Sequence, residues 1–183
     1  LLAVSAAGGN AAPGCVSRNL DSLLRLVSAD IPHSFSCSRP IDSGFWVNAR
    51  WSSSPAKPAA RSEYPDLPDS VQLLYSTLSA SAEPVTLVTI GPMTNTALLL
   101  IQHPDIAGKI GRIVSMGGSI HMDGVAGGPA EFNIKADPEA AAAVFSSGIP
   151  VFLFPLDVTK KKRIYPETIA SWEGRGPLIR SLR

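Results

Sequence analysis

The fold is decided by the stretch VTLVTIGPMTN at residues 85–95, in which an apolar run passes directly into a loop of small and polar residues. The same pattern returns in RIVSMGGS at residues 112–119 and in IPVFLFPLD at residues 149–157. Short apolar runs without polar alternation are typical of strands that are covered on both faces. We therefore expect buried strands at 85–90, 112–116 and 149–154.

Helical patterns lie around these runs. Thr94 or Asn95 is expected to cap a helix over residues 96–102. A helix at 17–28 is expected to bury four residues with the spacing of one helical face, namely Leu20, Leu23, Leu24 and Val27. The remaining elements expected from the sequence are helices at 69–80 and 166–174 and short strands at 1–6 and 31–38.

A further helix is expected after the second strand, with Asp137 as its cap, Pro138 in its first position and Gly148 just beyond its end. Strand, loop, helix and strand therefore alternate along the chain. This alternation predicts an α/β fold, with a wound, mostly parallel sheet and crossover helices. Ligands of such sheets lie beyond the carboxyl ends of the strands, where Ile90, Met116 and Asp157 fall.

The composition favours a globular domain and excludes several other classes. The chain has 183 residues, of which 45% are hydrophobic and 17% charged, so we expect one domain over residues 1–183. A net charge of +1 provides no field to attract nucleic acid. No apolar run approaches the ~18 residues of a membrane span. Cys15 and Cys37 are too few for a disulfide framework, which fits a cytoplasmic location.

Two regions lack a regular pattern. Residues 43–68 are rich in Ser, Pro and Ala and are interpreted as a long irregular loop. The basic run at 160–163 is interpreted as a solvated loop rather than a localisation signal. Because the chain starts without Met and stops soon after the helix at 166–174 begins, we expect it to be truncated at both ends.

Glu131 and Asn133 are two residues apart, so in an extended segment their side chains would point to one face. A carboxylate beside an amide suits the adjacent hydroxyls of a polyol, although such residues in a loop are more often simply solvated. Asn10 and Asn95, taken alone, are typical of turns and caps. Asp157 at a strand end is interpreted either as a loop brace or as a site residue.

Several common motifs are absent from the sequence. His33, His103 and His121 have no metal-ligand spacing, and His121 is a candidate ligand contact only through its place in a loop. No G-x-S-x-G nucleophile elbow occurs. The phosphate-binding motifs G-x-x-x-x-G-K-[ST] and G-x-G-x-x-G are absent as well. A generic Rossmann-type nucleotide binder is therefore disfavoured.

Taken together, the loops resemble those of the inosine–uridine-preferring nucleoside hydrolase family. The resemblance rests on the segments TLVTIGPMTN at 86–95, IVSMGG at 113–118, AEFNIKADPEAA at 130–141 and LDVT at 156–159. It implies a Rossmann-like nucleoside hydrolase fold. It also implies hydrolysis of the N-glycosidic bond of ribonucleosides to ribose and free base, with a bound Ca²⁺ and a homo-oligomeric dimer or tetramer.

By this resemblance, ribose would be bound by Asn10, Glu131 and Asn133 with Met116 packed near it, and the main-chain carbonyl of Ile90 would be one metal ligand. No catalytic residue is expected within 1–183. The family's aspartate-rich motif would precede Leu1, and its late His-Asp pair would follow Arg183. The segment alone is therefore expected to bind metal poorly and to turn over nothing, since Ca²⁺ takes about 6–8 oxygen ligands.

Two internal departures from the family pattern support an alternative. The family has Gly-Asn where this chain has Gly124-Val125, and no histidine-bearing loop is recognisable between Pro40 and Pro68. The alternative is a degenerate, non-catalytic relative that keeps the fold for binding or assembly.

Overall fold

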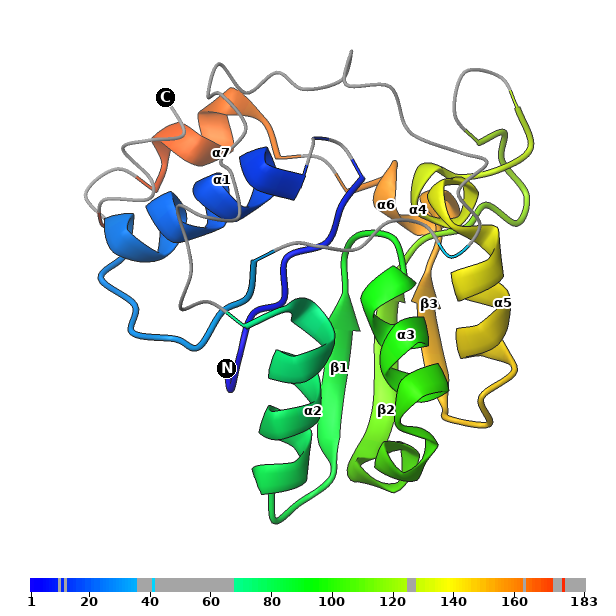
Figure 1. The fold of residues 1–183 in the computed structure, drawn as a ribbon. Helices are drawn as coiled ribbons and strands as arrows, with labels where there is room; N and C mark the ends of the chain where they lie inside the picture. The colour runs from blue at the N-terminus through cyan, green and yellow to red at the C-terminus, as the bar shows by residue number, and fades with distance from the viewer. Residues whose placement is uncertain are drawn as a thin grey trace.

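The structure of the chain is a computed structural model (Figure 1). It describes residues 1–9, 11, 13–35, 41, 68–124, 128–162, 164–172 and 176. Asn10, Val125 and the predicted loop at 43–68, apart from Pro68, lie outside the described residues. The expectation of a single domain over 1–183 stays a prediction.

Three parallel strands form a sheet in the order β1, β2, β3. They are β1 (Val85–Thr89), β2 (Ile110–Met116) and β3 (Val151–Phe154). Leu87 of β1 is paired with Ile113 of β2, which is paired in turn with Val151 of β3. The three main strand predictions are confirmed, with ends that differ by a residue or two.

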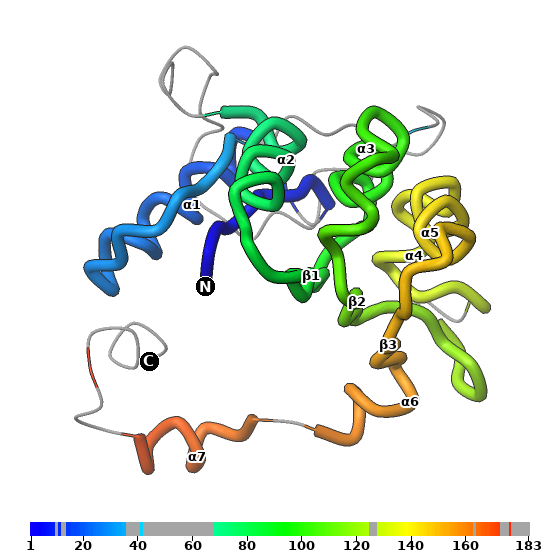
Figure 2. Tube along the Cα trace, turned by 90° about the horizontal axis from the view of Figure 1, so that it is seen from below, coloured from blue at the N-terminus to red at the C-terminus, as the bar shows by residue number. Residues whose placement is uncertain are grey.

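Helices cover one face of this sheet, as Figures 1 and 2 show. They are α2 (Ser70–Ala80), α3 (Thr94–Gln102), which the 3₁₀ helix η3 (Pro104–Lys109) follows, and α5 (Pro138–Phe145). The core between helices and sheet contains the buried side chains of Leu78, Leu87, Met93, Leu99, Ile113 and Val144. No helix among the described residues is both long and apolar enough to cross a membrane.

The predicted cap at Asp137 is confirmed, and the predicted cap at Thr94 or Asn95 is wrong. The structure also has a cap that was not predicted, at Asp69. The Asp69 carboxylate caps α2 by accepting from Gln72 N at 2.8 Å, and Asp137 caps α5. Gly148, with φ +79°, follows α5 in the left-handed conformation that favours glycine. By contrast, α3 begins at Thr94 after Met93, and neither Thr94 nor Asn95 caps it. Both side chains bond to distant segments instead, as described below.

The opposite face of the sheet is open in the part of the chain that the structure describes. Val88, Phe152 and Phe154 point to it and are 66%, 53% and 47% exposed. Figure 2 shows α6 (Leu156–Thr159) and α7 (Pro166–Ala170) on this side of the strands. The expectation that both faces are covered is therefore not met by the described residues.

The expected strand at 1–6 is reduced to a single bridge between Val4 and His33. The reason is that side chains replace a strand as partners of Ala6. Its N–H donates to Ser34 Oγ at 3.1 Å, and its carbonyl accepts from Ser70 Oγ at 2.9 Å. Of the expected strand at 31–38, residues 31–35 are described, and they form two isolated bridges, at His33 and Phe35.

The first helix, α1 (Pro13–Leu26), starts four residues earlier than expected. The prediction of its buried face is partly wrong. Leu24 is buried, whereas Leu23 is 44% and Val27 37% exposed. Among the described residues, α1 therefore buries one edge of its apolar face rather than the whole of it.

Candidate functional site

Glu131 is the N-cap of a short helix, α4 (Phe132–Ala136), at the carboxyl end of β2. It is 3% exposed. Its Oε2 atom accepts from the backbone N–H of Gly118 at 3.0 Å, Asn133 at 2.8 Å and Ile134 at 3.2 Å. These donors and the helix N-terminus stabilise a buried negative charge. The expectation of an extended segment here is wrong, because the carboxylate caps its own helix.

Asn133 is the second residue of α4 and is bonded to the end of β2. Its Nδ2 donates to Met116 O at 3.0 Å and lies 3.3 Å from Met116 Sδ. Glu131 and Asn133 therefore both hold the Met116–Gly118 segment, although they do so from a helix. The two side chains and Met116 form one bonded cluster.

The two glycines after Met116 are required by this close packing. Gly118 has φ +77°, which favours glycine. A Cβ on Gly117 would lie 3.3 Å from Ile134 Cδ1 and 3.5 Å from Glu131 Oε2. The end of β2 can therefore wrap around the Glu131 carboxylate only with small residues in both positions.

Three loops meet beside this cluster. Gly9 has φ +153°, and a Cβ there would lie 3.2 Å from Pro92 Cδ and 3.7 Å from Phe132 Cε1. The segment that leads to Asn10, the loop after β1 and the start of α4 are therefore in close approach. They border a cavity of about 780 Å³. Its lining includes Gly8, Ile90, Gly91, Pro92, Phe132 and Asn133.

The predicted site residues are only partly brought together at this cavity. Ile90, which directly follows β1, and Asn133 both line it, whereas Met116 and Glu131 lie behind Asn133. The Ile90 side chain is 80% exposed. The role of Asn10 stays a prediction, and its neighbour Gly9 approaches Pro92 and Phe132.

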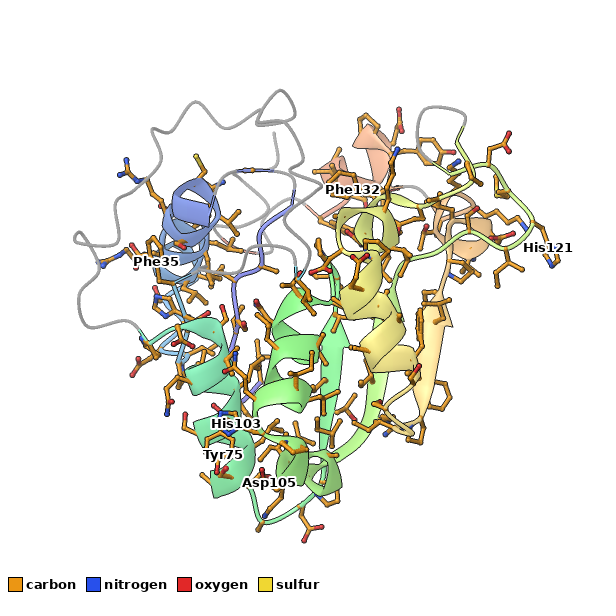
Figure 3. All side chains as sticks on the ribbon, turned by 45° about the vertical axis from the view of Figure 1, so that its right-hand side comes forward. Phe35, Tyr75, His103, Asp105, His121 and Phe132 are labelled. Carbon is orange, nitrogen blue, oxygen red and sulfur yellow. The ribbon has the colours of Figure 1, made fainter. Side chains whose placement is uncertain are left out.

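Phe132 is a site residue that the sequence reasoning missed. It lines the cavity and approaches Gly9, between the two polar residues that the motif singled out. The available signal was its place between Glu131 and Asn133, the two polar residues that the motif singled out. Figure 3 shows Phe132 at the end of the helices next to the carboxyl ends of the strands.

The histidines do not join this site. Figure 3 places His121 on an outer loop, away from Phe132, and His103 beside Tyr75 at the opposite end of the sheet. The His103 and Tyr75 rings stack with centroids 4.0 Å apart. No group of three or more His, Cys, Asp or Glu residues within the described ranges could hold a metal ion.

Asp157 braces the loop that follows Gly118. From α6, its Oδ2 accepts from Ile120 N at 2.9 Å and its Oδ1 from His121 N at 2.8 Å. The hydrogen bond from Ile120, followed by that from His121, holds the pKa of the Asp157 carboxyl below its ordinary value, while desolvation opposes the shift. Of the two interpretations of Asp157, the structure favours the loop brace.

We expect Asp157→Asn to speed amide hydrogen exchange at Ile120 and His121 by roughly five-fold or more, because two charge-assisted bonds are lost. The folded-state pKa is lowered, so the carboxylate stabilises the loop above the pKa of unfolded Asp. That contribution is lost as the pH falls through the folded-state value. NMR exchange rates, corrected for intrinsic rates, measure both effects. Asp123→Asn in the same loop is the control, and equal protection in both variants would contradict the brace.

Comparison with known proteins decides the family. The family model described as inosine-uridine preferring nucleoside hydrolase matches residues 1–182. The chain belongs to this family. Pyrimidine-specific ribonucleoside hydrolase RihA of Escherichia coli O7:K1 is 42% identical over 170 residues, which are 90% of this chain and 54% of that protein. The chain thus spans about half the length of the curated relatives it matches, and the predicted resemblance is confirmed.

Solved structures confirm the nucleoside hydrolase fold. An inosine-guanosine nucleoside hydrolase superposes with a TM-score of 0.82 at 24% identity, over 98% of this chain and 61% of that one. A purine-preferring ribonucleoside hydrolase from Gardnerella vaginalis gives 0.78 at 26% identity, over 94% and 57%. The predicted α/β class with a parallel sheet and crossover helices is confirmed as well.

Proposed function

We propose that the protein to which this chain belongs hydrolyses the N-glycosidic bond of ribonucleosides, giving ribose and free base. The observation that carries the proposal is the close approach of Gly9 to Pro92 and Phe132. This approach lies beside one cavity, which is lined by Ile90, Pro92, Phe132 and Asn133. Membership of a family of ribonucleoside hydrolases supports the same reaction. In that reaction, water adds to C1′ of ribose, the bond from C1′ to the base nitrogen breaks, and the base leaves with its electron pair and gains a proton.

The bonded cluster suggests how ribose would be held. Glu131 Oε2 is occupied by three backbone donors, which fix the carboxylate in place. Its Oε1 accepts no hydrogen bond among the described residues, so it is the oxygen we assign to a ribose hydroxyl. The Asn133 amide, held at Met116, would meet a neighbouring hydroxyl, and Asn10 a third. Adjacent hydroxyls then meet acceptors and donors that need little rearrangement.

Family membership implies a metal-dependent hydrolase, and we propose Ca²⁺ as the metal. When bound, such a cation lowers the pKa of a water and binds hydroxyl oxygens. The Ile90 carbonyl would be one ligand. The remaining ligands, the general base and the group that assists the leaving base are proposed to lie outside residues 1–183.

We expect the protein with its native flanking sequence to release base from inosine or uridine in the presence of Ca²⁺. Residues 1–183 alone are expected to release none and to bind Ca²⁺ weakly. Chromatography of the free base and calorimetric Ca²⁺ titration measure the two properties. Tight Ca²⁺ binding by residues 1–183 would contradict the ligand assignment. Absence of turnover with flanks and metal present would favour the alternative of a non-catalytic relative, which Val125 motivates.

The base preference is left open in this proposal, because one relative is named pyrimidine-specific and one structure purine-preferring. A homo-oligomeric state, dimer or tetramer, and a cytoplasmic location without nucleic-acid or membrane partners are also proposed. Light scattering of the purified protein tests the first of these.

A further inference from the structure

Two successive residues at the start of α3 make hydrogen bonds that the helix itself does not need. Thr94 and Asn95 are 4% and 6% exposed. Helix α3 has no side-chain cap, so the two polar side chains are free to bond elsewhere. They do so in two directions, toward two segments that lie far apart in the sequence.

Thr94 bonds to the end of the helix that carries the proposed ribose-binding residues. Its Oγ1 donates to Asp137 Oδ2 at 2.6 Å, and Asp137 is fully buried. Asp137 directly follows α4, which carries Glu131 and Asn133 at its start. Because a hydroxyl–carboxylate bond of this length is strong and directional, it fixes α4 relative to the loop after β1.

Asn95 bonds to the first segment of the chain. Its Nδ2 donates to Ser5 Oγ and to Ala6 O, both at 2.8 Å. Ala6 lies three residues before Gly9, which approaches Pro92 and Phe132. Asn95 therefore fixes the segment that leads to Asn10 relative to the same loop.

We propose that Thr94 and Asn95 are a positioning pair for the proposed active site. Together they hold three cavity-bordering segments in register, namely 5–9, 90–92 and 131–133. Each segment carries or adjoins at least one predicted ligand contact, so a small shift of any one would separate groups that must act on the same sugar. The effect on catalysis rests on the proposed function, whereas the mechanical coupling does not.

Thr94 and Asn95 would affect the rate by fixing the positions of other residues. Misplacement of reacting groups by about 1 Å can cost on the order of 100-fold in rate. Thr94→Val removes the hydroxyl at nearly constant volume. In the protein with its native flanks, we expect kcat/KM for inosine or uridine to fall by roughly 10- to 100-fold, with part of the loss in kcat. Thr94→Ser restores the hydroxyl and is expected to recover activity to within about three-fold.

Hydrogen exchange by mass spectrometry provides a readout that needs no turnover. Thr94→Val is expected to raise exchange in residues 131–136, and Asn95→Leu to raise it in residues 4–9, with no change in β1–β3. Ser5→Ala, which removes one acceptor of Asn95, is a milder variant should Asn95→Leu not fold. Ser76→Ala in α2 loses a hydroxyl bond that stays within its own helix, to Leu73 O, and is the control for hydroxyl loss without a bond between segments.

The outcomes separate the two proposals. Segment-specific exchange together with rescue by Thr94→Ser would establish the positioning pair. Lower melting temperature with unchanged exchange in both segments and unchanged kinetics would overturn it, since Thr94 and Asn95 would then serve stability alone. If the wild-type protein releases no base, the proposed function fails, but the exchange experiment still decides the coupling.

Discussion

Glu131→Gln is expected to lower kcat/KM for ribonucleosides by roughly 100-fold in the protein with its native flanks, while the chain still folds. The reason is that the two carboxylate oxygens have different partners: Oε2 binds backbone N–H groups, and Oε1 is assigned to ribose. Oε2 accepts from three backbone N–H groups, and one amide oxygen can replace it there. The amide NH₂ then occupies the place of Oε1, so a donor faces a ribose hydroxyl where an acceptor is needed.

Steady-state kinetics and thermal unfolding together test this prediction. Glu131→Gln should lose activity with a small loss of stability. Glu131→Ala should lose activity and, because three buried donors lose their acceptor, about 2–4 kcal/mol of unfolding free energy. Activity near that of the wild type in Glu131→Gln would mean that Glu131 only caps α4 and packs β2. The same two measurements on Phe132→Leu, which keeps an apolar side chain at the cavity, provide a comparison for the Glu131 variants.

The strands were predictable because each is an uninterrupted apolar run with polar residues at its carboxyl end. The parallel pairing follows from the alternation of strands and helices along the chain, and the sheet has its strands in the order β1, β2, β3. The register was not predictable from these patterns. Helix α4 was not predictable, because five residues are too few to show a 3.6-residue period. Its cap is also unusual in that Glu131 uses a long side chain to accept from its own first turn.

The local capping rule failed at Thr94 and Asn95 for a tertiary reason. A hydroxyl or amide can satisfy a helix end or a distant group, and the sequence gives no sign of which partner is nearer. Here the partners are Asp137 and Ser5, 43 and 90 residues away. The strand predicted at 1–6 failed for the same reason, because Ser34 and Ser70 bond to Ala6.

The places of the candidate residues in the fold were predictable in outline but not in detail. The rule for parallel sheets places Ile90 and Met116 at one edge, and the motif adds Glu131 and Asn133. The sequence could not tell that Asn133 lines the cavity while Glu131 lies behind it, since both lie in one short segment. Nor could it decide between brace and ligand for Asp157, which depends on two backbone N–H groups of a facing loop.

Asp137→Ala is expected to be the most destabilising single change in the described chain, at about 3–5 kcal/mol of unfolding free energy. The Asp137 carboxylate is fully buried. It accepts from Thr94 Oγ1 at 2.6 Å, Ile41 N at 3.1 Å and Ala140 N at 3.1 Å. Its removal leaves three donors without an acceptor and takes the cap from α5, and each of these losses costs free energy.

Asp137→Asn separates the contribution of the α5 cap from that of the other two hydrogen bonds to Asp137. The amide oxygen can keep the bond from Ala140 N and preserve the cap, while the NH₂ group then faces the N–H of Ile41. Thr94 Oγ1, which donates to the native carboxylate, can instead accept from that NH₂, so we expect a loss of about 1–3 kcal/mol. Urea unfolding with a common m-value measures both variants. A loss below about 1 kcal/mol in Asp137→Ala would mean that water reaches the three donors, and α3 and α5 would then be joined by apolar packing alone.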